Sequence, residues 1–104
     1  MNKINDTNAS GWQTFYNKNS EDGKKLSNQI QNGLNEVMLT ENKKTPKSIE
    51  NVYIVKNVEI PTTIVECGFL SNSEECNNLQ QEKYQDRLAW GIYNGIINYF
   101  YENS

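Results

Sequence analysis

The side chain best placed to do chemistry in this 104-residue chain is the carboxylate of Glu66. It follows residues 62–65, which are mostly β-branched and predict, together with Glu66, a short strand over 62–66 that is covered on both faces. Functional sites of open α/β sheets lie just beyond the carboxyl ends of the strands. A carboxylate there is partly removed from water, which suits it to proton transfer near neutral pH. We therefore interpret Glu66 as a candidate general base or acid; the alternative is that it caps the next turn or pairs with a lysine.

The residue types around Glu66 narrow the chemistry further. The chain has no histidine, which excludes a Ser-His-Asp triad, a Cys-His pair and a histidine-based metal site built from this chain alone. Cys67 and Cys76 are too few for a disulfide framework, and we interpret them as free thiols. Gly68 allows a sharp turn after Glu66, and Phe69 and Leu70 are typical of core anchors behind such a turn.

Composition and charge restrict the class of partner. The net charge is -3 with the basic residues scattered, so the sequence predicts no basic surface that could neutralise a row of phosphates, and we expect no nucleic-acid partner. No apolar run is long enough to span a bilayer, and the polar first residues do not resemble a signal peptide. Six tyrosines and two tryptophans could form a sugar-binding surface, but most of them fall on predicted core stripes.

Periodicity predicts the elements that position Glu66. One domain is expected, with a polar loop at 1–10 and structure from 11 to 104. The predicted order is strand, helix, strand, strand, helix, helix, and we expect an α/β layered domain with a mostly parallel sheet. The segments are a strand at 12–16, a helix capped by Asn19 or Ser20 and ending near 38, a surface connection at 39–48, strands at 52–55 and 62–66, a short helix at 72–80 and a last helix at 82–101.

The two longer helices should each bury one stripe. In the first helix the stripe is Leu26, Ile30, Leu34 and Val37. In the last helix the stripe is Tyr84, Leu88, Ile92, Ile96 and Phe100, widened by Ala89, Tyr93 and Ile97. Such a wide apolar stripe predicts that the last helix packs on something large.

Residues 60–72, which read IPTTIVECGFLSN, resemble the signature near the end of the zinc-dependent N-acetylmuramoyl-L-alanine amidases (amidase type 3). In that family an apolar strand ends in the catalytic glutamate, followed by x-Gly-Phe-Leu/Ile-Ser-Asn. The resemblance covers nearly the whole chain, because 11–16 is similar to a Gly-led aromatic strand of the family, 52–56 to its penultimate strand and 84–100 to its terminal helix. The germination-specific branch that acts on the spore cortex is the most similar.

The resemblance implies a hydrolase that cleaves the amide between N-acetylmuramic acid and L-alanine in peptidoglycan. In the family, Zn²⁺ held by His, Glu and His activates a water, and the residue that matches Glu66 takes its proton. This chain holds none of these zinc ligands, so we expect it to be the C-terminal part of a catalytic domain, a fragment inactive alone. Asn2 matches the last residue of the family's His-x-Asn motif, and Gly68 belongs to the signature that follows the catalytic glutamate. The resemblance therefore implies that Asn2 and Gly68 lie near the substrate.

The resemblance also implies action outside the cytoplasm, in cell wall or spore cortex, and leaves open whether an activator protein takes part. Two other hypotheses compete with a hydrolase fragment. One is a non-catalytic module that binds peptidoglycan or an amidase partner through an exposed sheet edge. The other is metal binding in a homo-oligomer through Glu66, Cys67 and Cys76, although consecutive strand residues point to opposite faces.

Overall fold

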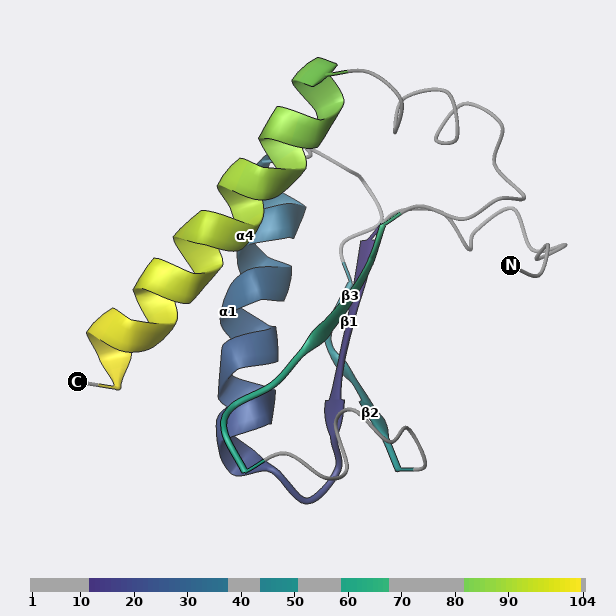
Figure 1. The fold of residues 1–104 in the computed structure, drawn as a ribbon, viewed down its shortest axis with the longest axis vertical. Coiled ribbons are helices and arrows are strands. Elements are labelled where there is room, and N and C mark those ends of the chain that lie inside the picture. Colours follow the sequence, from purple (N-terminus) through teal and green to yellow (C-terminus); the bar gives the residue numbers. More distant parts are fainter. Residues whose placement is uncertain (1–11, 38–43, 51–58, 68–81, 104) are drawn as a thin grey trace, which may run out of the picture.

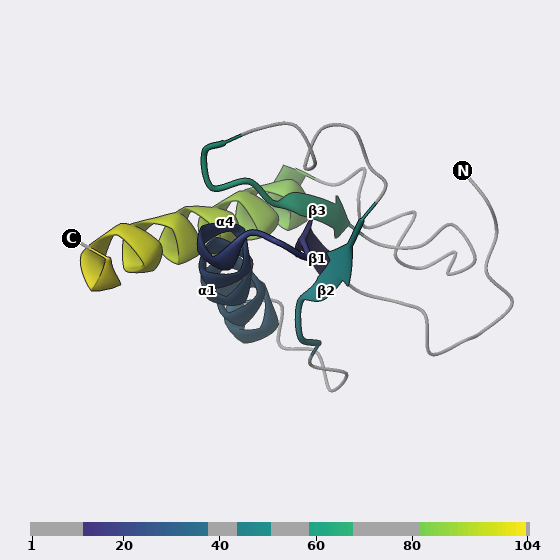
Figure 2. The same ribbon diagram turned by 90° about the horizontal axis from the view of Figure 1, so that it is seen from below.

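The structure is a computed structural model that describes residues 12–37, 44–50, 59–67 and 82–103 (Figure 1). Its elements are β1 (Trp12–Asn17), α1 (Glu21–Val37), β2 (Lys47–Ile49), β3 (Ile64–Cys67) and α4 (Glu82–Glu102). The strands form one sheet in the order β2-β1-β3. Helix α1 packs on β1, and α4 crosses α1 (Figures 1 and 2). The predicted α/β class is therefore confirmed.

The turn from β1 into α1 follows the predicted pattern. Ser20 caps the helix, because its Oγ accepts a hydrogen bond from the backbone N–H of Gly23 at 2.9 Å. Glu21 and Asp22 lie in the first turn, where their negative charges favour the positive end of the helix dipole. The predicted strand, cap and first helix are thus confirmed.

The direction of the strands differs from the prediction. β1 and β2 are parallel, with Phe15 opposite Lys47, whereas β1 and β3 are antiparallel, with Trp12 opposite Cys67. The described sheet is therefore mixed, and the expectation of a mostly parallel sheet is wrong for it. Alternation and β-branching indicate burial of a strand, but they carry no information about its direction. A consequence is that the carboxyl end of β3 lies beside the start of β1.

Two further boundaries need correction. Lys47 and Ser48 belong to β2 rather than to the predicted surface connection, although both side chains are exposed. Strand β3 begins at Ile64 rather than at residue 62, and residues 62–66 are half-buried rather than covered on both faces. The predicted loop at 1–10, strand at 52–55 and short helix at 72–80 lie outside the described residues.

The core lies between β1, α1 and the first half of α4. Trp12, Ile30, Leu34 and Leu88 are buried in one cluster. Partly buried side chains that pack against it are Leu26, Val37, Val65, Ile92 and Ile96. The predicted stripe of α1 is therefore confirmed in full, and that of α4 is confirmed at Leu88, Ile92 and Ile96.

The face that α4 turns toward α1 is set by two glycines of α4, Gly91 and Gly95, which the stripe prediction does not include. A β-carbon on Gly95 would overlap the Cα of Ile30, and one on Gly33 would overlap the carbonyl oxygen of Gly91. This close approach of the two backbones brings Gly91, Gly95 and Tyr99 into the buried face. The stripe prediction is wrong for Phe100, which is 64% exposed, and for three more exposed residues, Ala89, Tyr93 and Ile97.

The predicted stripe also includes Tyr84, whose side chain lies outside the described part of the structure.

Among the described residues, no helix combines the length and the apolar character needed to cross a membrane.

The helix crossing yields a test of stability. We expect Gly95→Ala to lower the free energy of unfolding by about 1–2 kcal/mol, because steric overlap with Ile30 outweighs the better helix propensity of alanine. Urea unfolding followed by circular dichroism measures the change. Asn98→Ala, at an exposed position of the same helix, is the control and should be neutral or slightly stabilising. Equal behaviour of the two variants would contradict the close crossing.

Candidate functional site

Glu66 is the penultimate residue of β3 and lies directly opposite Gln13 of β1. Side chains alternate along β1, and Thr14 points toward α1, where its Oγ1 lies 2.9 Å from the Oε1 of Gln31. Gln13 therefore lies on the other face, and cross-strand partners share a face. Glu66 thus lies on the face of the sheet that α1 leaves uncovered, and its side chain is half-buried.

No hydrogen bond or ion pair within the described residues engages the Glu66 carboxylate. An ion pair between described residues joins Lys18 Nζ and Glu50 Oε1 at 3.0 Å. It lies just after the end of β1, whereas Glu66 lies beside the start of that strand. The alternative that a lysine neutralises Glu66 therefore receives no support from the described part of the chain. A half-buried carboxylate at such a position can exchange protons with a bound water.

Gln13, the cross-strand neighbour of Glu66, was not predicted as part of the site. It is only 3% exposed, and its Nε2 donates hydrogen bonds to the carbonyl oxygens of Thr45 at 2.7 Å and Thr14 at 3.1 Å. These bonds hold the segment before β2 against β1. A glutamine inside a strand of aromatic and β-branched residues is the sequence signal that could have marked this position.

A buried carboxamide holds α1 against β1 on the opposite face of the sheet. Gln31 is fully buried, and its Oε1 accepts a hydrogen bond from the backbone N–H of Thr14 at 2.8 Å. Its Nε2 donates to the carbonyl oxygen of Trp12 at 2.9 Å. Pairing of β1 with β2 begins only at Phe15. The side chain of Gln31 therefore satisfies backbone groups in the part of β1 that precedes Phe15.

A second set of polar contacts leads to β3. Ser27 of α1, which is fully buried, lies with its Oγ 2.6 Å from the Oγ1 of Thr63. Thr63 in turn donates from Oγ1 to the carbonyl oxygen of Phe15 at 3.2 Å. The residue before β3 is therefore bonded to both α1 and β1, which fixes where the strand that carries Glu66 begins.

Most of the other predicted site residues fall outside the described part of the chain. Asn2, Gly68 and Cys76 lie outside the described residues, and Cys67 is described only as the last residue of β3. No group of three or more histidine, cysteine or carboxylate side chains that could hold a metal ion occurs in the described part.

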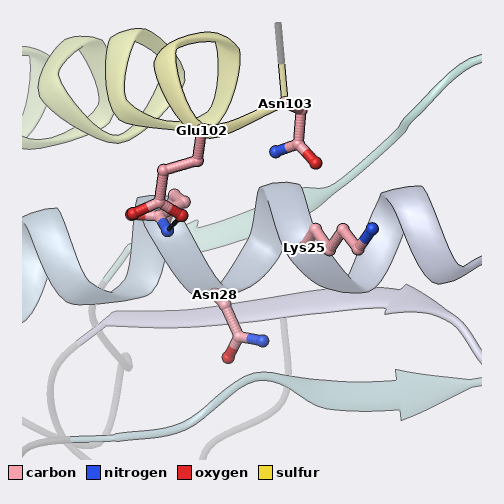
Figure 3. A pocket seen from close by; sticks show the side chains of 5 residues that line it. Lys25, Asn28, Glu102 and Asn103 are labelled. Carbon is pink, nitrogen blue, oxygen red and sulfur yellow. Dashed lines mark hydrogen bonds between the residues drawn. The ribbon is translucent and has the colours of Figure 1, made fainter.

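A polar hollow elsewhere on the surface is separate from this site. It is lined by Lys25, Asn28, Gln29, Glu102 and Asn103 (Figure 3). Gln29 Nε2 donates to Glu102 Oε2 at 2.7 Å, which ties the end of α4 to α1. The hollow lies toward the start of α1, whereas Glu66 lies at the end of the sheet where β1 begins (Figure 1).

These features define an α/β domain with a candidate acid-base carboxylate at the end of a strand. A family profile described as N-acetylmuramoyl-L-alanine amidase (Amidase_3) matches residues 1–98. The germination-specific N-acetylmuramoyl-L-alanine amidase of Bacillus subtilis is 37% identical over 102 residues, which are 98% of this chain and 43% of the relative. The chain belongs to the N-acetylmuramoyl-L-alanine amidase family.

Solved structures agree with this assignment. The CwlD amidase from Clostridioides difficile, solved in complex with the GerS lipoprotein, has a TM-score of 0.89 and 41% identity over 96% of this chain and 51% of that one. An N-acetylmuramoyl-L-alanine amidase from Clostridium difficile has a TM-score of 0.83 and 28% identity over 100% of this chain and 56% of that one. The chain thus spans about half the length of the relatives that it matches.

The buried carboxamide can be tested directly. We expect Gln31→Met to lower the free energy of unfolding by about 2–4 kcal/mol, because it removes the acceptor of the buried N–H of Thr14 and the hydrogen bond to the C=O of Trp12. Asn32→Met replaces a carboxamide by methionine at the exposed neighbouring position and should alter stability by less than about 0.5 kcal/mol. Denaturant titration compares the two variants. Similar losses in both would show that Gln31 does not hold the sheet.

Proposed function

We propose that this chain supplies the general base, Glu66, of an N-acetylmuramoyl-L-alanine amidase that cleaves the amide between N-acetylmuramic acid and L-alanine in peptidoglycan. The observation that carries the proposal is the position of Glu66. Its half-buried carboxylate lies one residue before the end of β3, on the face that α1 leaves uncovered, in a chain that belongs to the amidase family. Family membership supplies the reaction class, and the geometry supports the role of the residue.

The chemistry assigned to Glu66 is proton transfer. Its carboxylate accepts a proton from a water as the water oxygen attacks the carbonyl carbon of the amide. The same proton then passes to the nitrogen of L-alanine when the C–N bond breaks. The products are the lactyl carboxylate of N-acetylmuramic acid and a free amino group on the peptide.

The residues of this chain do not fit a zinc site. Histidine is absent from the sequence, and no cluster of three suitable ligands occurs in the described part. The proposal therefore assigns any Zn²⁺ of the working enzyme to ligands outside these 104 residues. It assigns no hydrolase activity to the isolated chain. Asn2 and Gly68 are proposed to lie beside the substrate.

A protein partner and an extracytoplasmic location form part of the proposal. The CwlD relative was solved in complex with a lipoprotein, which supports an activator protein for the enzyme to which this chain contributes. The germination-specific relative of Bacillus subtilis supports action in the spore cortex or cell wall.

The role of Glu66 can be tested in a joined enzyme. Residues 1–104 are placed behind the part of the Bacillus subtilis relative that the match leaves uncovered, and release of free amino groups from muropeptides is measured. We expect activity in the joined enzyme and a loss of about 10²–10⁴-fold in Glu66→Gln, because the amide cannot accept the proton. Glu59→Gln, at an exposed position ahead of β3, is the matched control and should keep full activity. Unchanged turnover in the Glu66 variant would refute its role.

The isolated chain provides a separate test. It should release no amino groups from muropeptides, with or without added zinc, because the ligands assigned to the metal lie elsewhere. Isothermal titration with zinc should show no stoichiometric binding. Hydrolysis by the isolated chain, or tight binding of zinc through Glu66 and the cysteines, would overturn the proposal that the ligands lie outside it.

A further inference from the structure

The outer face of α4 carries an apolar stripe that the fold leaves in solvent. Trp90, Tyr93, Ile97 and Phe100 recur at intervals of three, four and three residues, which places them on one side of the helix. Their exposed fractions lie between 47% and 64%. We call these four residues the outer stripe of α4. The opposite side of the same helix, around Gly91 and Gly95, packs on α1.

Helix α4 is therefore apolar on two sides. No charged residue occurs between Arg87 and Glu102. A helix that is apolar all round is normally covered all round, because each exposed apolar side chain loses the benefit of burial. The outer stripe differs from scattered surface hydrophobics in being contiguous, which is the property that marks interaction surfaces.

The area of the outer stripe is sufficient for association. Three aromatic side chains and one isoleucine at these exposures leave on the order of 500 Å² accessible. Two such stripes in contact would bury roughly 1,000 Å² in total, which is the lower bound of specific protein interfaces. Residues at the margin of the stripe, such as Ala89, would add to this area.

The spacing of the outer stripe makes it complementary to itself. Positions 90 and 100 are symmetric about residue 95, and so are positions 93 and 97. Consider two antiparallel copies of α4 related by a twofold axis that crosses the outer stripe at the height of residue 95. Trp90 of one copy would then lie against Phe100 of the other. Tyr93 would lie against Ile97 in the same way. Self-complementarity of this kind is what a twofold-symmetric dimer requires.

Other occupants fit the stripe less well. An anionic membrane surface would need basic residues beside the apolar face, but the chain has a net charge of -3 and its stripe is uncharged. A sugar chain would stack on open aromatic faces. The ring of Trp90 instead stacks on that of Tyr93 with centroids 5.8 Å apart, and the aliphatic Ile97 interrupts the aromatic surface.

From these observations we propose that the outer stripe of α4 is a homodimer interface, in which two copies of this chain pack α4 against α4 in antiparallel orientation. The proposed interface is separate from the candidate site, because Glu66 lies on the face of the sheet that points away from α1, whereas the outer stripe belongs to α4. The inference does not depend on the proposed amidase function.

Sedimentation equilibrium of the chain, from about 1 to 200 µM, tests the proposal. We expect a monomer-dimer equilibrium, and at least a tenfold higher dissociation constant for Ile97→Glu. Asn98→Glu adds the same charge at the neighbouring exposed position off the stripe and should leave the constant within about twofold. A wild-type chain that stays monomeric over this range would overturn the proposal, and so would equal dissociation by the two variants. Circular dichroism verifies that both variants remain folded.

A mixing experiment tests the antiparallel pairing. Ile97→Glu and Tyr93→Lys should each be monomeric alone, and an equimolar mixture should form heterodimers, because the introduced carboxylate and ammonium then face each other across the interface. Ile97→Glu mixed with Asn98→Lys is the matched control and should not recover heterodimers beyond the level of Ile97→Glu with wild type. Recovery in the control alone, or in neither mixture, would refute the pairing of position 93 with position 97.

Discussion

The hydrogen bonds of one buried side chain, Gln31, hold the helical layer on the sheet. Its carboxamide occupies the backbone N–H of Thr14 and the C=O of Trp12, at the part of β1 that β2 does not reach. A buried backbone group without a partner costs about 1–3 kcal/mol, so α1 cannot slide along β1 without losing these bonds. The position of α1 in turn decides where α4 and β3 lie.

Two consequences follow from the fixed position of α1. On one side, Gly33 and Ile30 meet the glycines of α4, and the close crossing rotates α4 so that its aromatic side faces solvent. On the other side, Ser27 contacts Thr63 just before β3. The candidate base on β3 and the proposed dimer interface on α4 are thus placed by the same helix.

The sequence predicts local structure well and spatial relations poorly. Strand β1, the cap at Ser20 and the stripe of α1 follow from side-chain periodicity and capping chemistry, and all three are confirmed. The direction of β3 could not be read, because alternation is the same in either direction. The buried side of α4 was misjudged at Phe100, because hydrophobicity marks apolar residues while glycine decides how closely two helices approach.

The candidate site shows the same contrast between local patterns, which could be predicted, and spatial relations, which could not. Glu66 could be chosen from the sequence because it ends an apolar run and because the following residues resemble a family signature. Its neighbour Gln13 stands out in the sequence as a glutamine among aromatic and β-branched residues, but its place opposite Glu66 could not be predicted, because the pairing of β1 with β3 joins residues far apart in the chain. Zinc and its ligands are proposed from the family, while the position of Glu66 on the face of the sheet away from α1 rests on the geometry.

In the proposed enzyme, β3 presents the Glu66 carboxylate to the scissile amide. A crystal structure of the joined enzyme with an uncleavable muropeptide measures this directly. We expect a carboxylate oxygen of Glu66 within about 3 Å of a water that lies against the amide carbonyl carbon. A carboxylate turned away from the bound amide, with another residue in contact with that water, would contradict it.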